Sequence, residues 1–210
     1  MQFTLSDQSL LICYYGIHRE NIYYFDSPGP HNTADAARFA VSRAKELGLS
    51  KVVVASTSGE TALKFYDELK GSGLQLIVVT HVVGFTKPGI WEFQKDIGER
   101  LTLNGVRIVT GTHVLSGLER AISRSAKVGG GSRTDAIAES LRKNVAVGLK
   151  VAIECTLIAA DQGAVGVEEE IIAVGGTMSG SDTVCVIRPS HTSSFFDLQV
   201  REIVAMPRNR

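Results

Sequence analysis

Residues 51–61, KVVVASTSGET, decide the fold of this chain. A short apolar run, Val52 to Ala55, has the β-branched composition of a buried strand, and hydroxyl residues and a glycine end it before a helical pattern begins. Hydroxyl donors, a glycine that lets the backbone approach a ligand and the free N–H groups of a helix start all favour an anion. The segment therefore predicts a strand that leads into an anion-binding helix start, within an α/β domain.

The composition fits one hydrophobic core and gives no sign of a strongly charged partner. The chain has 210 residues, 44% of them hydrophobic, so we expect a single domain over 1–210, with 1–30 as an N-terminal arm or edge strands. Its 22 basic and 22 acidic residues balance, which predicts no binding to nucleic acid or to a membrane surface. No apolar run has the form of a signal peptide or a membrane span, so we expect a cytoplasmic protein.

The cysteines and histidines argue against a disulfide framework and against a metal site. Cys13, Cys155 and Cys185 form no CxxC pair and lie in apolar sequence, which indicates buried, reduced thiols. The 5 histidines show no metal-ligand spacing. We therefore expect no metal.

Helical patterns alternate with β-branched runs along the chain. The predicted strands are 52–55, 76–80, 106–109, 170–174, 183–188 and 200–206, with one or two more within 10–25. The predicted helices begin near residues 33, 60, 93, 116, 132 and 149. This alternation predicts a three-layer α/β/α sandwich around a mixed, mostly parallel sheet.

Three of the helix starts carry capping signals. Asn32 or Thr33 is placed to cap the first helix, and Ser116 with Glu119 has the spacing of a capping box. Ser132 and Asp135 place a similar cap after the glycines 129–131, which predict a mobile bend.

Polar residues and glycines follow four predicted strands, at the sheet edge where ligands bind in parallel α/β folds. The candidate binding residues are Ser56, Thr57, Ser58, Gly59 and Thr61 after the first strand, Thr80, His81 and Gly84 after the second, Thr112 and His113 after the third, and Gly175, Gly176 and Thr177 after 170–174. The alternative for the hydroxyls is that they only cap the helix, and for the glycines that they form a tight turn. A lone histidine is often structural.

Glu154 is the most unusual single charge, because it lies in a helical stretch that is otherwise suited to full burial. A buried carboxylate must be paired, protonated or hydrogen-bonded, so Glu154 either borders the ligand crevice or pairs with an arginine or a helix end. The basic stretch from Arg120 to Lys143 can assist an anionic ligand, but its alternation with acidic residues favours a solvated face. No hydrolase motif stands out, and the sequence identifies no catalytic residue.

Several of these segments resemble the C-terminal α/β domain of pyruvate kinase, and more closely a family of stand-alone archaeal and bacterial proteins built on that domain. They are SPGPHNT at 27–33, VVASTSGETA at 53–62, HVLSGLERAISR at 113–124, SRTDAIAE at 132–139, AVGGTMSGSDTVCVIRP at 173–189 and FFDLQVREIVAMPR at 195–208. The resemblance implies a five-stranded core sheet of order 3-2-1-4-5 whose last strand is antiparallel. Strands 52–55 and 170–174 would then be neighbours at the ligand crevice.

The resemblance also implies a ligand. In pyruvate kinases, the loop that matches Ser56 to Thr61 binds the phosphate of a sugar-phosphate activator, and the stand-alone relatives imply flavin mononucleotide (FMN) in the same crevice. The matching segments contain no catalytic barrel, so pyruvate kinase activity is not implied, whereas a flavin-dependent oxidoreductase and a ligand sensor both remain open. The alternative is a regulatory or structural module that binds a sugar phosphate or no ligand and acts through protein association. We expect a homo-oligomer, because the apolar N-terminal arm and the extra C-terminal strand can cover sheet edges.

Overall fold

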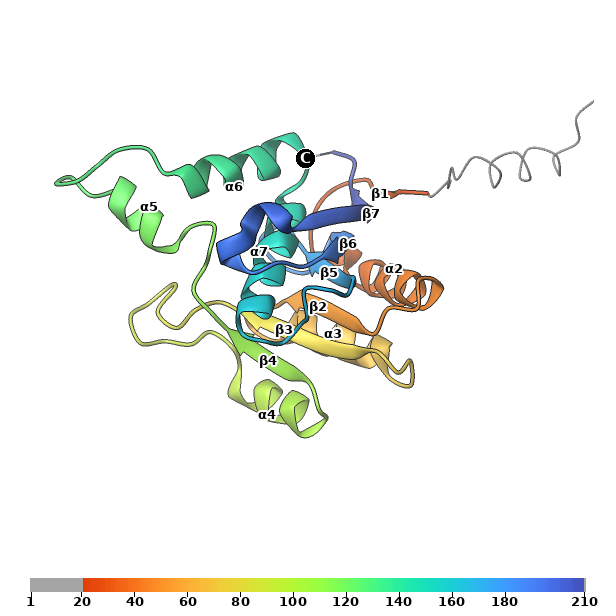
Figure 1. Ribbon diagram of the computed structural model, residues 1–210. Helices are drawn as coiled ribbons and strands as arrows, with labels where there is room; N and C mark the ends of the chain where they lie inside the picture. The colour runs from red at the N-terminus through yellow and green to blue at the C-terminus, as the bar shows by residue number, and fades with distance from the viewer. Residues whose placement is uncertain (1–20, 210) are drawn as a thin grey trace, which may run out of the picture.

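The computed structural model describes residues 21–209, in which helices and strands alternate as the sequence predicts (Figure 1). The strands are β1 (Tyr23–Phe25), β2 (Lys51–Ala55), β3 (Gln75–Thr80), β4 (Arg107–Thr110), β5 (Ile171–Gly175), β6 (Thr183–Arg188) and β7 (Gln199–Pro207). The α-helices are α2 (Thr33–Glu46), α3 (Glu60–Leu69), α4 (Lys95–Leu103), α5 (Gly117–Ser123), α6 (Arg133–Asn144) and α7 (Val147–Asp161). Two 3-10 turns, η1 (Pro30–Asn32) and η2 (Thr192–Asp197), complete the elements.

All seven of these strands lie in one sheet, in the order β1-β7-β6-β5-β2-β3-β4. Strands β5, β2, β3 and β4 run parallel, and β6 pairs antiparallel with β5. Counted from β2, the core therefore has the predicted order 3-2-1-4-5 with an antiparallel last strand. β7 adds antiparallel to β6, and β1 adds parallel to β7, as further strands at that side of the sheet.

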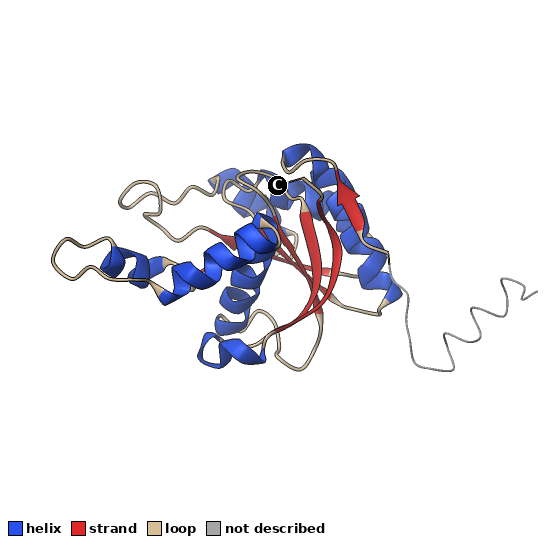
Figure 2. Ribbon diagram, turned by 90° about the horizontal axis from the view of Figure 1, so that it is seen from above, coloured by secondary structure: helices blue, strands red, loops and turns tan. Residues whose placement is uncertain are grey.

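The sheet is the middle layer of the predicted sandwich, as Figure 2 shows from above. Successive side chains of a strand point to opposite faces, so Val52 and Val54 pack with α2, α3 and α4, whereas Val53 packs with α7. α7 is buried along most of its length, which agrees with its nearly continuous apolar sequence. The three-layer prediction is confirmed.

Two of the three predicted helix caps are wrong. The turn η1 runs directly into α2, so Asn32 has a helical backbone (φ −82°, ψ −8°) instead of the extended one that a capping residue needs. The side-chain amide of Asn32 donates to Ser27 O at 2.8 Å. Thr33 Oγ1 donates to Pro30 O at 2.7 Å and accepts from Ser181 N at 3.1 Å, so neither candidate caps α2. Ser116 forms no side-chain cap either. Glu119 does not complete a capping box, because its carboxylate accepts from Thr134 N and Ser132 Oγ at the start of the next helix, both at 2.9 Å.

The remaining cap is confirmed, since Ser132 Oγ accepts from Asp135 N at 3.0 Å. Cys155 and Cys185 are free and buried, as predicted, and burial raises the pKa of each thiol to about 12. Cys13 and most of the predicted strand region 10–25 lie outside the described residues. No helix within residues 21–209 is long and apolar enough to cross a membrane.

Candidate binding pocket

A pocket of about 320 Å³ lies at the carboxyl ends of the parallel strands, between the loop after β2 and the loop after β5. This is the crevice expected where the strand order reverses. Its volume lies within the range of small-molecule sites. The predicted residues that line it are Ser56, Thr57, Ser58, Thr61, Thr80, His81, His113, Glu154 and Gly176.

Five predicted residues lie outside this lining. Gly59 is buried at the start of α3, where a Cβ would stand 2.7 Å from Ile97 Cγ2. Gly84 is exposed in the loop between β3 and α4, and Thr112 is exposed after β4. Gly175 ends β5 against α7, and Thr177 N donates to Asp182 Oδ2 at 3.1 Å. The structure therefore brings together the hydroxyl and histidine candidates more than the glycines.

The hydroxyl groups of the 56–58 loop have structural duties of their own. Ser56 Oγ is buried and accepts from Gly59 N at 3.2 Å and from Ala62 N at 3.3 Å, so it caps α3. Ser58 Oγ accepts a long hydrogen bond (3.5 Å) from Glu60 N, and Thr57 Oγ1 lies 3.3 Å from His81 Nε2. The capping alternative is therefore correct for Ser56.

The backbone of the same loop retains donors. Within residues 21–209, no acceptor pairs with the N–H groups of Thr57, Ser58 and Thr61. Three such groups beside a helix start are the usual ingredients of an anion site. The predicted anion preference of the loop thus rests on its backbone N–H groups more than on its hydroxyls.

The loop after β5 is held in place by a distant segment of the chain. Asp182, fully buried, accepts from Gly29 N and Thr177 N at 3.1 Å each and from Thr183 Oγ1 at 2.9 Å. Gly180, with a φ of +73°, lies against Pro30. The 27–33 segment therefore sets the position of the pocket edge formed by Gly176 and residues 178–180.

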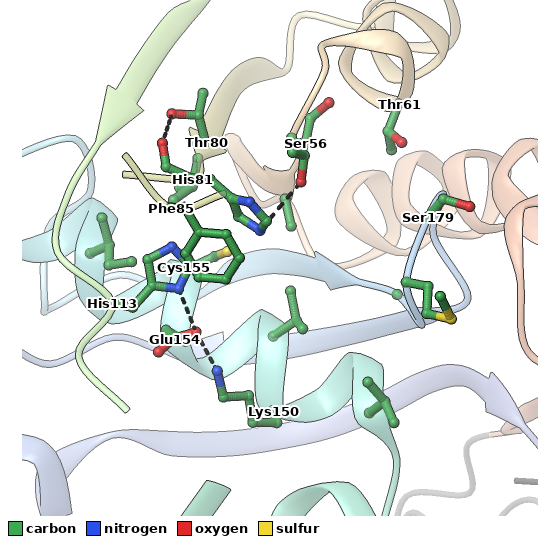
Figure 3. Close-up of a pocket in the computed structure, with 18 of the residues that line it drawn as sticks. Ser56, Thr61, Thr80, His81, Phe85, His113, Lys150, Glu154, Cys155 and Ser179 are labelled. Atoms are coloured by element: carbon green, nitrogen blue, oxygen red, sulfur yellow. Dashed lines mark hydrogen bonds and ion pairs between the residues drawn. The ribbon is translucent and has the colours of Figure 1, made fainter. Parts of the chain in front are cut away.

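A buried charged cluster lines the other side of the pocket (Figure 3). Lys150 and Glu154 face each other one turn apart on α7, with side chains only 5% and 6% exposed, and form a close ion pair. Glu154 Oε1 also accepts from Leu115 N at 2.9 Å, and His113 Nδ1 lies 3.6 Å from its other oxygen. Burial opposes the ionisation of Glu154, but the His113 hydrogen bond and the Lys150 charge outweigh it and lower the pKa to about 2.

Aromatic rings cover this cluster. The Phe85 ring stacks on His113 at a centroid distance of 4.9 Å and lies 4.1 Å from the His81 ring. His81 Nδ1 lies 3.1 Å from Glu92 Oε2, which positions that ring. His113 Nε2 is buried without a hydrogen-bond partner among the described residues.

Several lining residues were not found from the sequence. They include Glu60, Phe85, Ser116, Arg120, Arg142, Val147, Lys150, Val151, Cys155, Ile158, Met178, Ser179 and Gly180. Lys150 had a usable signal, because it precedes Glu154 by four residues and both interrupt one apolar helix. Arg120 and Arg142 belong to the basic stretch expected to form a solvated face, yet both line the pocket.

These two arginines have acidic partners. Arg120 pairs with Asp135 at 2.7 Å, and Arg142 pairs with Glu139 at 2.5 Å. The pocket therefore has cationic side chains whose charges are already balanced. No group of three or more potential metal ligands occurs within 21–209.

Comparison with known families agrees with this architecture. The family described as "Pyruvate kinase, alpha/beta domain" matches residues 34–187, a range that contains every residue lining the pocket. The matched range is more than half of the 210-residue chain and includes β2 to β5. The chain therefore belongs to the pyruvate kinase alpha/beta domain family.

Proposed function

We propose that this chain binds a phosphate-bearing small molecule in the pocket, with the phosphate beside the start of α3, and that this molecule is FMN. The main support is the set of unpartnered N–H groups of Thr57, Ser58 and Thr61, which belong to pocket-lining residues. A phosphate oxygen would accept from them and also interact with the positive end of the helix dipole.

A second helix start supports the same position. α7 begins at Val147, which lines the pocket, and its N-cap residue Ala146 has no side chain that can cap the helix. An anion bound between α3 and α7 would serve both helix starts. Figure 3 places Thr61 and Ser179 on the side of the pocket opposite His113 and Glu154.

The choice of FMN rests on the resemblance to stand-alone relatives and on the mixed character of the pocket. Val151, Cys155, Ile158 and Phe85 give the pocket an apolar side that suits a flavin ring. A bound flavin supplies electron and hydride transfer, while the residues of this chain bind and orient it. Both redox catalysis and ligand sensing are compatible with this proposal.

The first test is a visible absorption spectrum of the protein purified without added cofactor, with mass analysis of the material released on denaturation. A flavin band and released FMN are expected. A colourless protein that takes up neither FMN nor a sugar phosphate would contradict the proposal.

The phosphate position is tested with Thr61→Val, which keeps the backbone donors and replaces the pocket-lining hydroxyl by a methyl group of similar volume. The Thr61 hydroxyl has no hydrogen-bond partner among the described residues, so it can donate to the phosphate beside the Thr61 N–H. We expect weaker binding of FMN, by about tenfold, and unchanged binding of riboflavin, which lacks the phosphate. Thr112→Val is the matched control, since Thr112 is exposed and lies outside the pocket. An equal loss of affinity for FMN and for riboflavin in Thr61→Val would show that the phosphate lies elsewhere.

The alternative role, association with other chains, has one specific observation in its favour. Leu118 and Ile122 of α5 and Val128 in the following loop are 74%, 42% and 72% exposed, on the projecting arm seen in Figure 2. Residues 111–146 contain six Lys and Arg but three Asp and Glu, whereas the whole chain is neutral, so the remainder is acidic. A second copy of this chain is therefore a fitting partner for the arm.

Sedimentation analysis of wild type and Leu118→Asp tests this association. We expect an oligomer that dissociates in the variant, with a weaker association at high salt. A wild-type monomer at all concentrations would exclude it.

A further inference from the structure

We infer that the pocket selects a monophosphate whose other end is an uncharged planar ring with a hydrogen-bond acceptor, and that Lys150 binds that acceptor. This inference rests on the proposed function and specifies the ligand class of the same site. The inference is argued from the charge balance of the pocket, from the geometry of Lys150 and from the aromatic side of the pocket.

The charge balance disfavours a second anionic group. Each cationic side chain that lines the pocket has an acidic partner: Lys150 with Glu154, Arg120 with Asp135 and Arg142 with Glu139. Glu60 adds a further carboxylate to the lining. One phosphate can be held by backbone N–H groups and helix dipoles, but a second would find no unbalanced cation among these lining residues.

Lys150 still has hydrogen-bonding capacity to offer. An ammonium group carries three N–H donors, and the bond to Glu154 uses one of them. The side chain is buried, so a polar ligand group that displaces water from this side of the pocket meets a donor in a low-dielectric setting. Because the pair is neutral as a whole, an uncharged acceptor such as a ring carbonyl suits it better than a second anion.

Glu154 acts through Lys150 as a positioning residue. Its carboxylate is held by Leu115 N and His113 as well as by Lys150, so its orientation is set from three directions. Buried ion pairs are often less stabilising than apolar replacements, which leaves the placement of the Lys150 ammonium as a functional reason for this one.

The shape on this side fits a flat ring. Phe85 is 49% exposed and lies against both His81 and His113, so its ring presents a partly open face beside the charged pair (Figure 3). Aromatic faces stack on planar heterocycles with offset geometry. A sugar bisphosphate has neither the flat ring nor the uncharged end, so FMN fits this class better than a bisphosphate activator does.

The test compares Lys150→Met with Thr61→Val, using FMN, riboflavin and ribose 5-phosphate as probes in calorimetric titrations. Lys150→Met should weaken FMN and riboflavin equally, by about tenfold, and leave ribose 5-phosphate unchanged. Thr61→Val should weaken FMN and ribose 5-phosphate and leave riboflavin unchanged. Because Lys150→Met removes the lysine partner of the buried Glu154 carboxylate, the double variant Lys150→Met, Glu154→Gln is measured beside it as a neutral pair of similar size.

The outcomes separate the two proposals. Normal riboflavin binding by both Lys150 variants, or tighter binding of fructose 1,6-bisphosphate than of FMN by the wild type, would overturn the inference and leave phosphate binding intact. Failure of the wild type to bind FMN, riboflavin and ribose 5-phosphate would overturn both. Lost riboflavin binding in the double variant, with ribose 5-phosphate retained, would support the inference.

Discussion

Gly180 lies so close to Pro30 that a Cβ on Gly180 would stand 2.4 Å from Pro30 Cα, across 150 residues of sequence. The contact joins the loop after β5 to the segment before α2. We expect Gly180→Ala to lower the free energy of unfolding by about 3 kcal/mol, because the methyl group meets backbone and φ is +73°. Chemical denaturation measures this, and FMN affinity should fall as the pocket edge shifts.

Gly71→Ala separates the two causes. Gly71 has nearly the same φ, +71°, but nothing lies within 4 Å of its added Cβ. Gly71→Ala should lower the free energy of unfolding by about 1 kcal/mol, from backbone strain alone. If both variants lose the same stability, the contact with Pro30 is not what constrains Gly180.

The sequence predicted the parts of this structure that local patterns control. The β-branched run at Val52, the hydroxyl-glycine turn and the apolar helix around Glu154 identified the sheet edge and the crevice. Neither the hydrogen bond from Gly29 N to Asp182 nor the contact of Gly180 with Pro30 could be predicted. Both depend on the packing of the 27–33 segment against a distant loop.

The same distinction explains why the sequence left the role of Ser56 open, gave the wrong partner for Glu119 and missed Lys150. Ser56 has the residue type of a phosphate ligand and of a helix cap, and only the backbone geometry shows that it caps α3. Glu119 has capping-box spacing, yet its carboxylate accepts hydrogen bonds from residues at the start of the next helix. Lys150 was missed because a charge on an apolar helix gains meaning only when its partner, Glu154, is considered with it.

The pairing of Glu154 predicts a loss of stability in strong acid. Its pKa is about 2 in the folded chain, against 4.5 for an unperturbed glutamate side chain, so ionised Glu154 stabilises the fold above pH 4.5. That contribution, of about 3 kcal/mol, is lost as pH falls through about 2. Unfolding free energies measured between pH 6 and 2 should therefore decline less steeply in Glu154→Gln than in wild type.

Glu46→Gln is the control for this pH series. The hydrogen bond from Arg43 also lowers the pKa of Glu46, but that carboxylate is exposed and solvent screens it. Its variant should change the slope much less. Parallel slopes in Glu154→Gln and wild type would show that Glu154 is not held in its ionised form by its neighbours.

The link from Glu119 to α6 predicts a local change in amide exchange. Glu119→Ala removes the acceptor of Thr134 N, so hydrogen exchange at Thr134 should become faster. Asp135 N keeps its bond to Ser132 and should change less. Glu139→Ala on the same helix serves as the control, and unchanged exchange at Thr134 in Glu119→Ala would exclude the link in solution.

Glu60 gives a prediction of the opposite sign to the other pocket variants. Its exposed carboxylate lines the pocket at the start of α3. There it interacts favourably with the positive end of the helix dipole, but it repels a phosphate. Glu60→Gln should tighten FMN binding by about threefold at low salt and leave riboflavin binding unchanged, with the gain shrinking as salt rises. Glu68→Gln, exposed near the other end of α3, should change neither. Weaker FMN binding in Glu60→Gln would mean that this carboxylate accepts a hydrogen bond from the ligand, and the phosphate would then have to lie away from the start of α3.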